Sequence, residues 1–244
     1  MRAKIRLCVD AELGAGQSVS VTRDQAHYLS AVMRQGPGDA VAVFNGRQGE
    51  WTARVVEVGK RGGRLECEAQ ALPQVDPADV WLLFAPIKKA RTDFIVEKAA
   101  EMGVRRIVPV ITRHTNAGRV RRDRLQAHAT EAAEQCGGVF VPPVAEVMPL
   151  DAVLDAWPTG RRILFCDETL AGGKVALHTQ APDLDPGPWA VLIGPEGGFS
   201  DDERSRIAAL PGALSTALGP RVLRADTAAV AALTLWHRAL GDWR

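Results

Sequence analysis

The stretch from Trp189 to Ser200 constrains the fold of this chain more than any other. Its apolar run, residues 190–193, has the length and composition of a fully buried strand, and it ends abruptly at a Gly-Pro-Glu-Gly-Gly loop. Ser200 follows, with Glu203 three residues later, which is the pattern of a capping box at the start of a helix. A buried strand, a glycine-rich loop and a helix in this order are typical of an open α/β sheet, where ligands bind at such turns.

The chemistry of this loop favours a ligand without phosphates. Its glycines match neither the G-x-G-x-x-G nor the G-x-x-x-x-G-K-[ST] spacing of phosphate-binding loops. Glu196 in the loop and the acidic residues 201–203 in the first helical turn complement the helix dipole and would repel a phosphate. A ligand with a hydroxylated sugar or a positive charge, such as S-adenosylmethionine, fits better. On the loop alone, a tight turn without any ligand is the alternative.

Length and composition indicate a folded protein of one large or two ordinary domains, since the 244 residues are 46% hydrophobic. No apolar run approaches the roughly 20 residues of a membrane span. The N-terminus has no long apolar region behind its positive charges, so we expect a cytoplasmic protein without a secretory signal. The four cysteines lack C-x-x-C spacing and the five histidines lack metal-ligand spacing. We therefore expect buried free thiols and no metal.

The N-terminal part of the chain reads as a small β-barrel or sandwich between Val19 and Leu72. Apolar and polar residues alternate over 51–56 and again over 65–70, as in half-buried strands. Turns are expected at Asn45-Gly46 and Gly62-Gly63, and one helix, capped by Asp24, is expected over 25–34.

Beyond the Pro73 to Pro77 region the pattern changes to alternating strands and helices, which predicts a parallel sheet covered by helices. Strands are expected over 80–85, 106–111, 139–141, 162–166, 189–193 and 213–218. Helices are expected over 92–102, 122–136, 150–156, 200–210 and 227–240.

Charge is distributed unevenly along the chain. The net charge of the whole chain is +1, but residues 86–124 contain eleven basic and four acidic side chains, a local net charge of +7. A basic surface of this kind suggests an anionic polymer such as nucleic acid as partner. For any single residue of this segment, an ordinary solvated helix face is the alternative.

Two further loops carry candidate functional residues. Arg221 and Arg224 lie in an otherwise apolar turn, where an arginine needs either a carboxylate or a substrate as partner. Asp226 or Thr227 is expected to cap the final helix. The loop after the strand that ends near Cys166 contains Asp167-Glu168, whose carboxylates either accept hydrogen bonds from a ribose or adenine or are exposed loop charges.

With these residues assembled, the chain resembles the RsmE family of SPOUT methyltransferases, which methylate N3 of a uridine in the 16S RNA of the small ribosomal subunit. The most specific matches are Ile-Gly-Pro-Glu-Gly-Gly-Phe-Ser at 193–200 and Leu-Gly-Pro-Arg-Val-Leu-Arg at 218–224. Further matches are His-Tyr-Leu at 27–29, Val-Met-Arg at 32–34, Glu-Met-Gly-Val at 101–104 and Glu-Ala-Ala-Glu-Gln-Cys at 131–136. The sequence departs from the family pattern at Asp226, where glutamate is usual, and at Gly138, where arginine is usual.

The resemblance implies a fold, a cofactor and partners. Residues 1–74 are expected to form a PUA-like β-barrel that binds RNA, and residues 75–244 a SPOUT-type trefoil-knotted parallel sheet covered by helices. The protein is expected to act on 16S ribosomal RNA as a homodimer, with Val230, Leu233 and Trp236 of the broadly apolar last helix in the dimer contact. The S-adenosylmethionine-binding residues implied are Gly194, Pro195, Glu196, Gly197, Gly198, Leu218, Gly219, Arg221, Val222, Leu223 and Arg224.

Methylation at uracil N3 requires loss of the imide proton, and a guanidinium stabilises the carbonyl oxygen on which charge then accumulates. We therefore expect Arg221 or Arg224 to serve catalysis and Asp226 to orient an arginine or accept the proton, while Glu196 fixes the cofactor loop. The expected RNA-binding residues are Arg34, Lys88, Lys89, Arg91 and Arg113. Two other functions stay open: a non-catalytic ribosome-assembly factor that binds RNA, and a SPOUT methyltransferase that acts on another RNA.

Overall fold

The computed structural model describes residues 3, 5–173, 177 and 184–243. The chain forms two compact units, one made of Met1–Asp76 with Ala133–Val141 and the other of Pro77–Ala132 with Pro142–Arg244. Each unit has its own sheet and its own apolar core. Among the described residues, no helix has the length and apolar character needed to cross a membrane.

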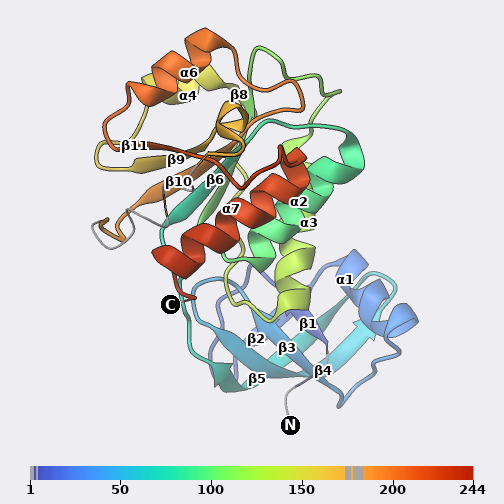
Figure 1. The fold of residues 1–244 in the computed structure, drawn as a ribbon. Helices are drawn as coiled ribbons and strands as arrows, with labels where there is room; N and C mark the ends of the chain where they lie inside the picture. Colours follow the sequence, from blue (N-terminus) through green and yellow to red (C-terminus); the bar gives the residue numbers. More distant parts are fainter. Residues whose placement is uncertain (1–2, 4, 174–176, 178–183, 244) are drawn as a thin grey trace. The chain divides into compact units, whose positions relative to one another are not determined.

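The sheet of the first unit has five strands in the order β1-β3-β4-β5-β2 (Figure 1). Its pairs are antiparallel except for β1 with β3. The predicted alternation is confirmed, because Ala53 and Val55 are buried while Arg54 between them is exposed. The strands are β1 (Arg6–Cys8), β2 (Ser18–Val21), β3 (Ala40–Phe44), β4 (Glu50–Gly59) and β5 (Gly62–Leu72).

The helix of this unit differs from the prediction at both ends. Thr22, not Asp24, is the N-cap of α1 (Arg23–His27): its hydroxyl accepts from the Gln25 backbone N–H at 3.3 Å, and the Gln25 side chain accepts from the Thr22 N–H at 3.0 Å. This reciprocal pair satisfies two N–H groups, which a cap at Asp24 would leave unmet. The chain then continues as a π-helical turn over Tyr28–Val32 rather than as a regular helix.

Two predicted local features of the chain were wrong. Gly62 and Gly63 lie inside β5, and the turn before them is formed by Lys60 and Arg61. The predicted strand over 139–141 is irregular backbone. The backbone just before it is held by a distant residue, because the Arg6 guanidinium donates to the carbonyls of Ala133, Glu134 and Gly138 at 2.5–2.8 Å.

The sheet of the second unit is parallel and has six strands in the order β11-β9-β10-β6-β7-β8. The central strand β10 is buried at all five positions, as its apolar run predicts. Registers place Ile193 beside both Phe84 and Cys166, so β6, β9 and β10 end level at the carboxyl edge. The strands are β6 (Val80–Phe84), β7 (Arg106–Ile111), β8 (Met148–Pro149), β9 (Arg162–Cys166), β10 (Trp189–Ile193) and β11 (Ala213–Thr216).

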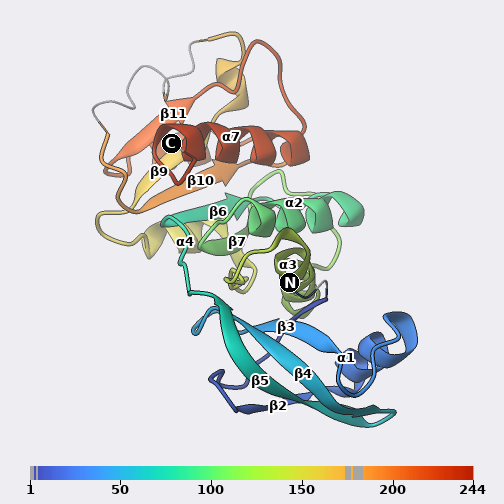
Figure 2. The ribbon, with the colours of Figure 1, turned by 90° about the horizontal axis from the view of Figure 1, so that it is seen from below.

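Helices cover both faces of this sheet, which confirms the predicted α/β layering. Helices α4 and α6 lie on one face, while α2 and α7 lie side by side on the other (Figures 1 and 2). The helices are α2 (Lys89–Glu101), α3 (Arg122–Cys136), α4 (Leu150–Asp155), α6 (Asp201–Ala208) and α7 (Ala225–Ala239). The trefoil knot stays a prediction, because residues 174–176 and 178–183 between β9 and β10 lie outside the described residues.

Helix α7 corrects two expectations. Its N-cap is Arg224 and makes no side-chain capping bond, so neither Asp226 nor Thr227 is the cap. Leu233 and Trp236 are 1% and 0% exposed, because α7 packs on α2 and β10 of its own chain. Both side chains are therefore core residues and are closed to a second copy.

Candidate functional site

A pocket of about 320 Å³ opens at the carboxyl edge of the second unit's sheet. Three loops surround it, one after each of the neighbouring strands β9, β10 and β11. The Gly172 N–H donates to the Gly219 carbonyl at 3.0 Å and joins the first loop to the third. The three loops that the sequence singled out therefore meet in one place.

Most of the predicted cofactor residues line this pocket, and the catalytic candidates Arg221 and Arg224 are among them. Gly197, Gly198 and Gly219 belong to the same loops but do not line it. The lining residues are Cys166, Asp167, Glu168, Ala171, Ile193, Gly194, Pro195, Glu196, Leu218, Arg221, Val222, Leu223, Arg224, Ala225 and Ala228.

The glycines of the β10 loop are required by the protein's own packing. A Cβ on Gly194 would lie 2.5 Å from the ring of Phe199, and one on Gly197 would lie 3.1 Å from the Cβ of His114. Gly198 has a φ of +69°, and its Cβ would lie 2.1 Å from a carboxylate oxygen of Glu168. A side chain at any of these positions would therefore force the loop or its neighbours to move.

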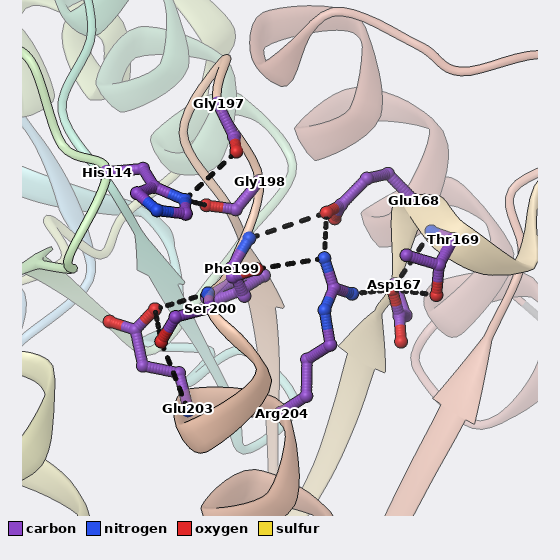
Figure 3. A network of polar contacts seen from close by, with 10 residues as sticks. All are labelled: His114, Asp167, Glu168, Thr169, Gly197, Gly198, Phe199, Ser200, Glu203 and Arg204. Carbon is purple, nitrogen blue, oxygen red and sulfur yellow. Dashed lines mark hydrogen bonds and ion pairs between the residues drawn. The ribbon is translucent and has the colours of Figure 1, made fainter.

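Phe199 and the capping box fix the loop to the helix that follows. The Phe199 ring is buried against Phe165, with ring centroids 5.0 Å apart at 80°. The predicted capping box is confirmed: the Ser200 hydroxyl accepts from the Glu203 N–H, while the Glu203 carboxylate accepts from the Ser200 N–H at 2.8 Å (Figure 3). The same carboxylate accepts from the Arg113 N–H at 2.8 Å, so the β7 loop is tied in as well.

His114 holds the tip of the loop and was not predicted. Its Nδ1 lies 3.1 Å from the Gly197 carbonyl oxygen and 3.2 Å from that of Gly198 (Figure 3). Carbonyl oxygens only accept hydrogen bonds, so Nδ1 carries the proton in this arrangement. No pattern within the sequence around His114 points to this contact, because its partners are more than 80 residues away.

Arg204 on α6 anchors the β9 loop and was also missed. Its guanidinium pairs with Asp167 and Glu168 and donates to the Phe199 carbonyl at 3.0 Å (Figure 3). Burial lowers the pKa of Arg204, but hydrogen bonds to the two carboxylates raise it by more, so the group stays charged. The Asp167 side chain is 10% exposed, which excludes the alternative of an exposed loop charge.

Arg91, predicted to bind RNA, lies at the rim of this pocket and pairs with two of its carboxylates. Its guanidinium lies 3.3 Å from a carboxylate oxygen of Glu196 and 3.6 Å from one of Asp226. Asp226 therefore orients Arg91, whereas the expectation left open which arginine it would orient. The other Asp226 oxygen accepts from the neighbouring Thr227 N–H at 2.8 Å.

Arg221 and Arg224 have no ion-pair or hydrogen-bond partner for their side chains within the described part of the chain, and both are exposed at the pocket. The sequence left open whether the partner of Arg221 and Arg224 is a carboxylate of the protein or a substrate. Among the described residues, no carboxylate is that partner. Around the pocket, Arg91 and Arg204 each form ion pairs with two carboxylates, while Arg221 and Arg224 form none with the described residues. The carboxylates that share Arg91 and Arg204 therefore keep part of their negative charge, while Arg221 and Arg224 keep their positive charge.

Cys166 lines the pocket as an apolar group. Burial raises the pKa of its thiol to about 12, so the thiol stays neutral at physiological pH and is a poor nucleophile. All four cysteines are free, but the expectation that they are buried fails for Cys136, which is exposed, and for Cys8, which is partly exposed.

The remaining RNA-binding candidates are scattered. Lys88 and Lys89 are exposed at the start of α2, and Arg113 is exposed after β7. Arg34 belongs to the first unit, where it is exposed at a φ of +55° after the π-helical turn. None of these four lines the pocket. No group of three or more metal-binding side chains occurs among the residues that the structure covers, and His178 lies outside them.

Comparison with known proteins decides the family. The model of an RNA methyltransferase domain matches residues 74–237, and that of an RNA methyltransferase PUA domain matches residues 21–66. A Synechocystis protein named ribosomal RNA small subunit methyltransferase E is 31% identical over 231 residues, covering 93% of this chain and 75% of that protein. The chain belongs to the RsmE family. An RsmE protein of the same name from Rickettsia conorii is 26% identical over 229 residues, which cover 93% of each chain.

Two solved structures, one of an RsmE protein and one of a putative methyltransferase, have the same fold over nearly the whole length of the chain. One from Neisseria gonorrhoeae, bound to S-adenosylmethionine, has a TM-score of 0.85 at 26% identity and covers 98% of this chain and 99% of its own. A Legionella pneumophila methyltransferase in complex with the same cofactor has a TM-score of 0.83 at 28% identity and covers 99% and 100%. The RsmE assignment therefore rests on both units and not on the cofactor loops alone.

Proposed function

We propose that this protein transfers a methyl group from S-adenosylmethionine to N3 of a uridine in the 16S RNA of the small ribosomal subunit. The observation that carries the proposal is the pocket at the carboxyl edge of the sheet in a chain of the RsmE family. Its lining includes two arginines, Arg221 and Arg224, that have no partner among the described residues. The names of its relatives, and the cofactor held by two structural neighbours, support the same reaction.

The residues of the pocket fit this cofactor chemically. S-adenosylmethionine combines a flat base, whose faces pack on apolar groups, and ribose hydroxyls with an ammonium, a sulfonium and a carboxylate. Ile193, Leu218 and Leu223 offer apolar lining for the base. Asp167 and Glu168 share a single arginine, so they retain negative charge for hydroxyl or cationic groups. When bound, the cofactor supplies the electrophilic methyl group.

The chain's own residues must deal with the proton on N3. Neutral uracil has no available lone pair at that atom, so the imide proton has to leave before or during transfer. We propose that Arg221 or Arg224 donates a hydrogen bond to the uracil carbonyl oxygen that gains charge as the proton leaves. Both guanidiniums are free to do so, because the carboxylates of the site are already taken by Arg91 and Arg204.

Asp226 fits a positioning role better than that of a base. Its carboxylate faces Arg91, which in turn reaches Glu196 in the cofactor loop. We propose that this bridge holds the β10 loop against the start of α7. An Asp226→Asn variant should then weaken cofactor binding while the single-turnover rate at saturating cofactor is retained. A loss of the saturated rate with unchanged cofactor affinity would make Asp226 a proton acceptor instead.

Two experiments separate the alternative functions. Calorimetric titration with S-adenosylhomocysteine should give heat, whereas a non-catalytic assembly factor that only retains the fold should give none. Mass mapping of methylated nucleosides should show that 16S RNA from a strain lacking this gene has lost one N3-methyluridine. A missing methyl group on another RNA would favour the other SPOUT reaction.

We also propose that the protein works in the cytoplasm and as a homodimer. Leu233 and Trp236 are buried in the core and cannot contact a second copy. Of the three predicted contact residues on α7, only the half-buried Val230 is therefore still a candidate. Light scattering at micromolar concentration should give twice the chain mass of 26.2 kDa. A monomer at that concentration would remove the dimer from the proposal.

A further inference from the structure

The second unit has another pocket of about 320 Å³, between the start of α2 and the loop that leads from β7 into α3. Its lining is distinct from that of the first pocket. Four of the lining side chains are cationic and none is acidic. The lining residues are Ile87, Lys89, Thr92, Gly118, Arg119, Val120, Arg121, Arg124 and Leu125.

The positive charge of this second pocket is only partly neutralised. Arg124 pairs with Asp93, whose side chain is 10% exposed, and Arg121 pairs with Asp123 on the surface. The Arg121 pair is 63% and 65% exposed, and exposed ion pairs contribute little free energy. Lys89 and Arg119 make no ion pair within the described residues. The pocket therefore retains about two uncompensated positive charges and a third that is weakly held.

One wall of the pocket is fixed in place. Asp93 on α2 pairs with Arg124 on α3 and also lies 3.6 Å from Nε2 of His128, whose Nδ1 lies 3.0 Å from Glu97. A buried carboxylate with these partners keeps Arg124 at the pocket wall. Ile87 and Leu125, 6% and 2% exposed, give the pocket an apolar floor.

This combination fits one nucleotide of an RNA strand. A phosphodiester binds to cationic donors, and a base packs against an apolar surface; the lining of this pocket contains both kinds of group. A free inorganic anion would use only the charges and leave the apolar floor unfilled. The pocket also equals the first one in volume, and that first pocket is proposed to hold a nucleoside derivative.

The two pockets are linked through the first turn of α2. Lys89 lines the second pocket, and Arg91, two residues later, contacts Glu196 at the first. We infer that the second pocket binds a nucleotide that flanks the target uridine, with its phosphate on Lys89, Arg119 and Arg121. This inference rests on the proposed RNA methylation and adds a site through which the strand is held while the uridine enters the first pocket.

The test compares Lys89→Ala/Arg119→Ala with the wild-type protein in binding a fluorescein-labelled ten-nucleotide oligouridylate at several salt concentrations. The slope of log affinity against log salt should flatten by about 0.7 for each single-strand phosphate contact that is lost. Arg119→Lys should restore most of the slope that Arg119→Ala loses, because the charge returns. Arg206→Ala is the matched control, since Arg206 is an exposed arginine on α6 that pairs with Asp151 and Asp155.

Cofactor binding keeps the two proposals apart. S-adenosylhomocysteine should bind the double variant with wild-type affinity, which also shows that the variant is folded. One outcome is that the wild-type protein binds S-adenosylhomocysteine and methylates RNA while the double variant keeps the wild-type slope of log affinity against log salt. In that case the second pocket is ordinary basic surface, and only this inference fails. If the wild-type protein neither binds the cofactor product nor methylates any RNA, the proposed function fails first.

Discussion

Gly198→Ala tests the claim that the cofactor loop is pre-shaped by the protein itself. Gly198 has a φ of +69°, and an alanine in this left-handed region costs about 1–2 kcal/mol. The added Cβ would also lie 2.1 Å from an oxygen of Glu168. That oxygen is at the end of a flexible side chain, so rotation relieves the clash, but rotation breaks its contact with Arg204. A hydrogen bond to a charged group contributes about 1.5–3 kcal/mol.

Gly160→Ala is the matched control in the same unit. Gly160 has a φ of +80° and nothing within 4 Å of the added Cβ, so it carries the backbone strain without the displaced side chain. Urea unfolding should show Gly198→Ala to be less stable than Gly160→Ala by about 1.5–3 kcal/mol. Calorimetry should show weaker S-adenosylhomocysteine binding for Gly198→Ala alone.

A second substitution isolates the clash between the added Cβ and the Glu168 side chain. Glu168→Ala removes the obstacle, so Gly198→Ala combined with Glu168→Ala should be less destabilised than the sum of the two single variants. Equal unfolding free energies for Gly198→Ala and Gly160→Ala, with equal cofactor affinities, would refute the reasoning. The loop would then adapt to its ligand and would not be fixed beforehand.

Three further predictions concern the site and the core. Arg221→Ala or Arg224→Ala should lower the single-turnover methylation rate at saturating cofactor by about 10²–10³, as for loss of a preorganised donor; full rates for both would make these residues cofactor scaffolding only. Arg91→Ala should weaken S-adenosylhomocysteine binding without flattening the salt dependence of RNA binding; a flattened slope would return Arg91 to the RNA surface. Burial lowers the pKa of His237 below its usual 6.5, so folding stability should be fully present above pH 6.5 and fall as the pH drops below it. His237→Phe should abolish that part of the pH dependence in urea titrations, and an unchanged pH profile would contradict it.

Features encoded within a few residues were predictable from the sequence. The strand Trp189–Ile193 has its predicted bounds because a continuous apolar run can only be satisfied by burial on both faces. The Ser200 capping box is local as well, since both partners lie within one helical turn. The same rule applies to Thr22 and Gln25, which form a capping box three residues apart, whereas Asp24 between them is not the cap.

Features that depend on distant partners were not predictable. The segment at residues 139–141 has the composition of a strand, yet the structure gives it no strand partner, and the backbone just before it is held by Arg6. His114 contacts glycines 83 and 84 positions away, and Arg204 pairs with carboxylates 36 and 37 positions away. Such contacts arise only when the sheet order brings β9 between β10 and β11.

The division of labour among the arginines follows from this geometry and not from residue type. Arg204 pairs with Asp167 and Glu168, whose side chains are 10% and 30% exposed, so replacing it leaves partly buried negative charges without a counterion and should cost stability. Arg91 pairs with Asp226, which is 19% exposed, and with Glu196, which is 54% exposed, so replacing it should cost less. Arg221 and Arg224 pair with no carboxylate among the described residues, so replacing either one should cost little stability and act on function alone. A comparison of unfolding free energy with methylation rate across the four alanine variants therefore separates the arginines that build the pocket from those that work in it. The sequence singles out Arg221 and Arg224 by their apolar turn, but only the distances between groups show that Arg91 and Arg204 pair with the carboxylates of the pocket.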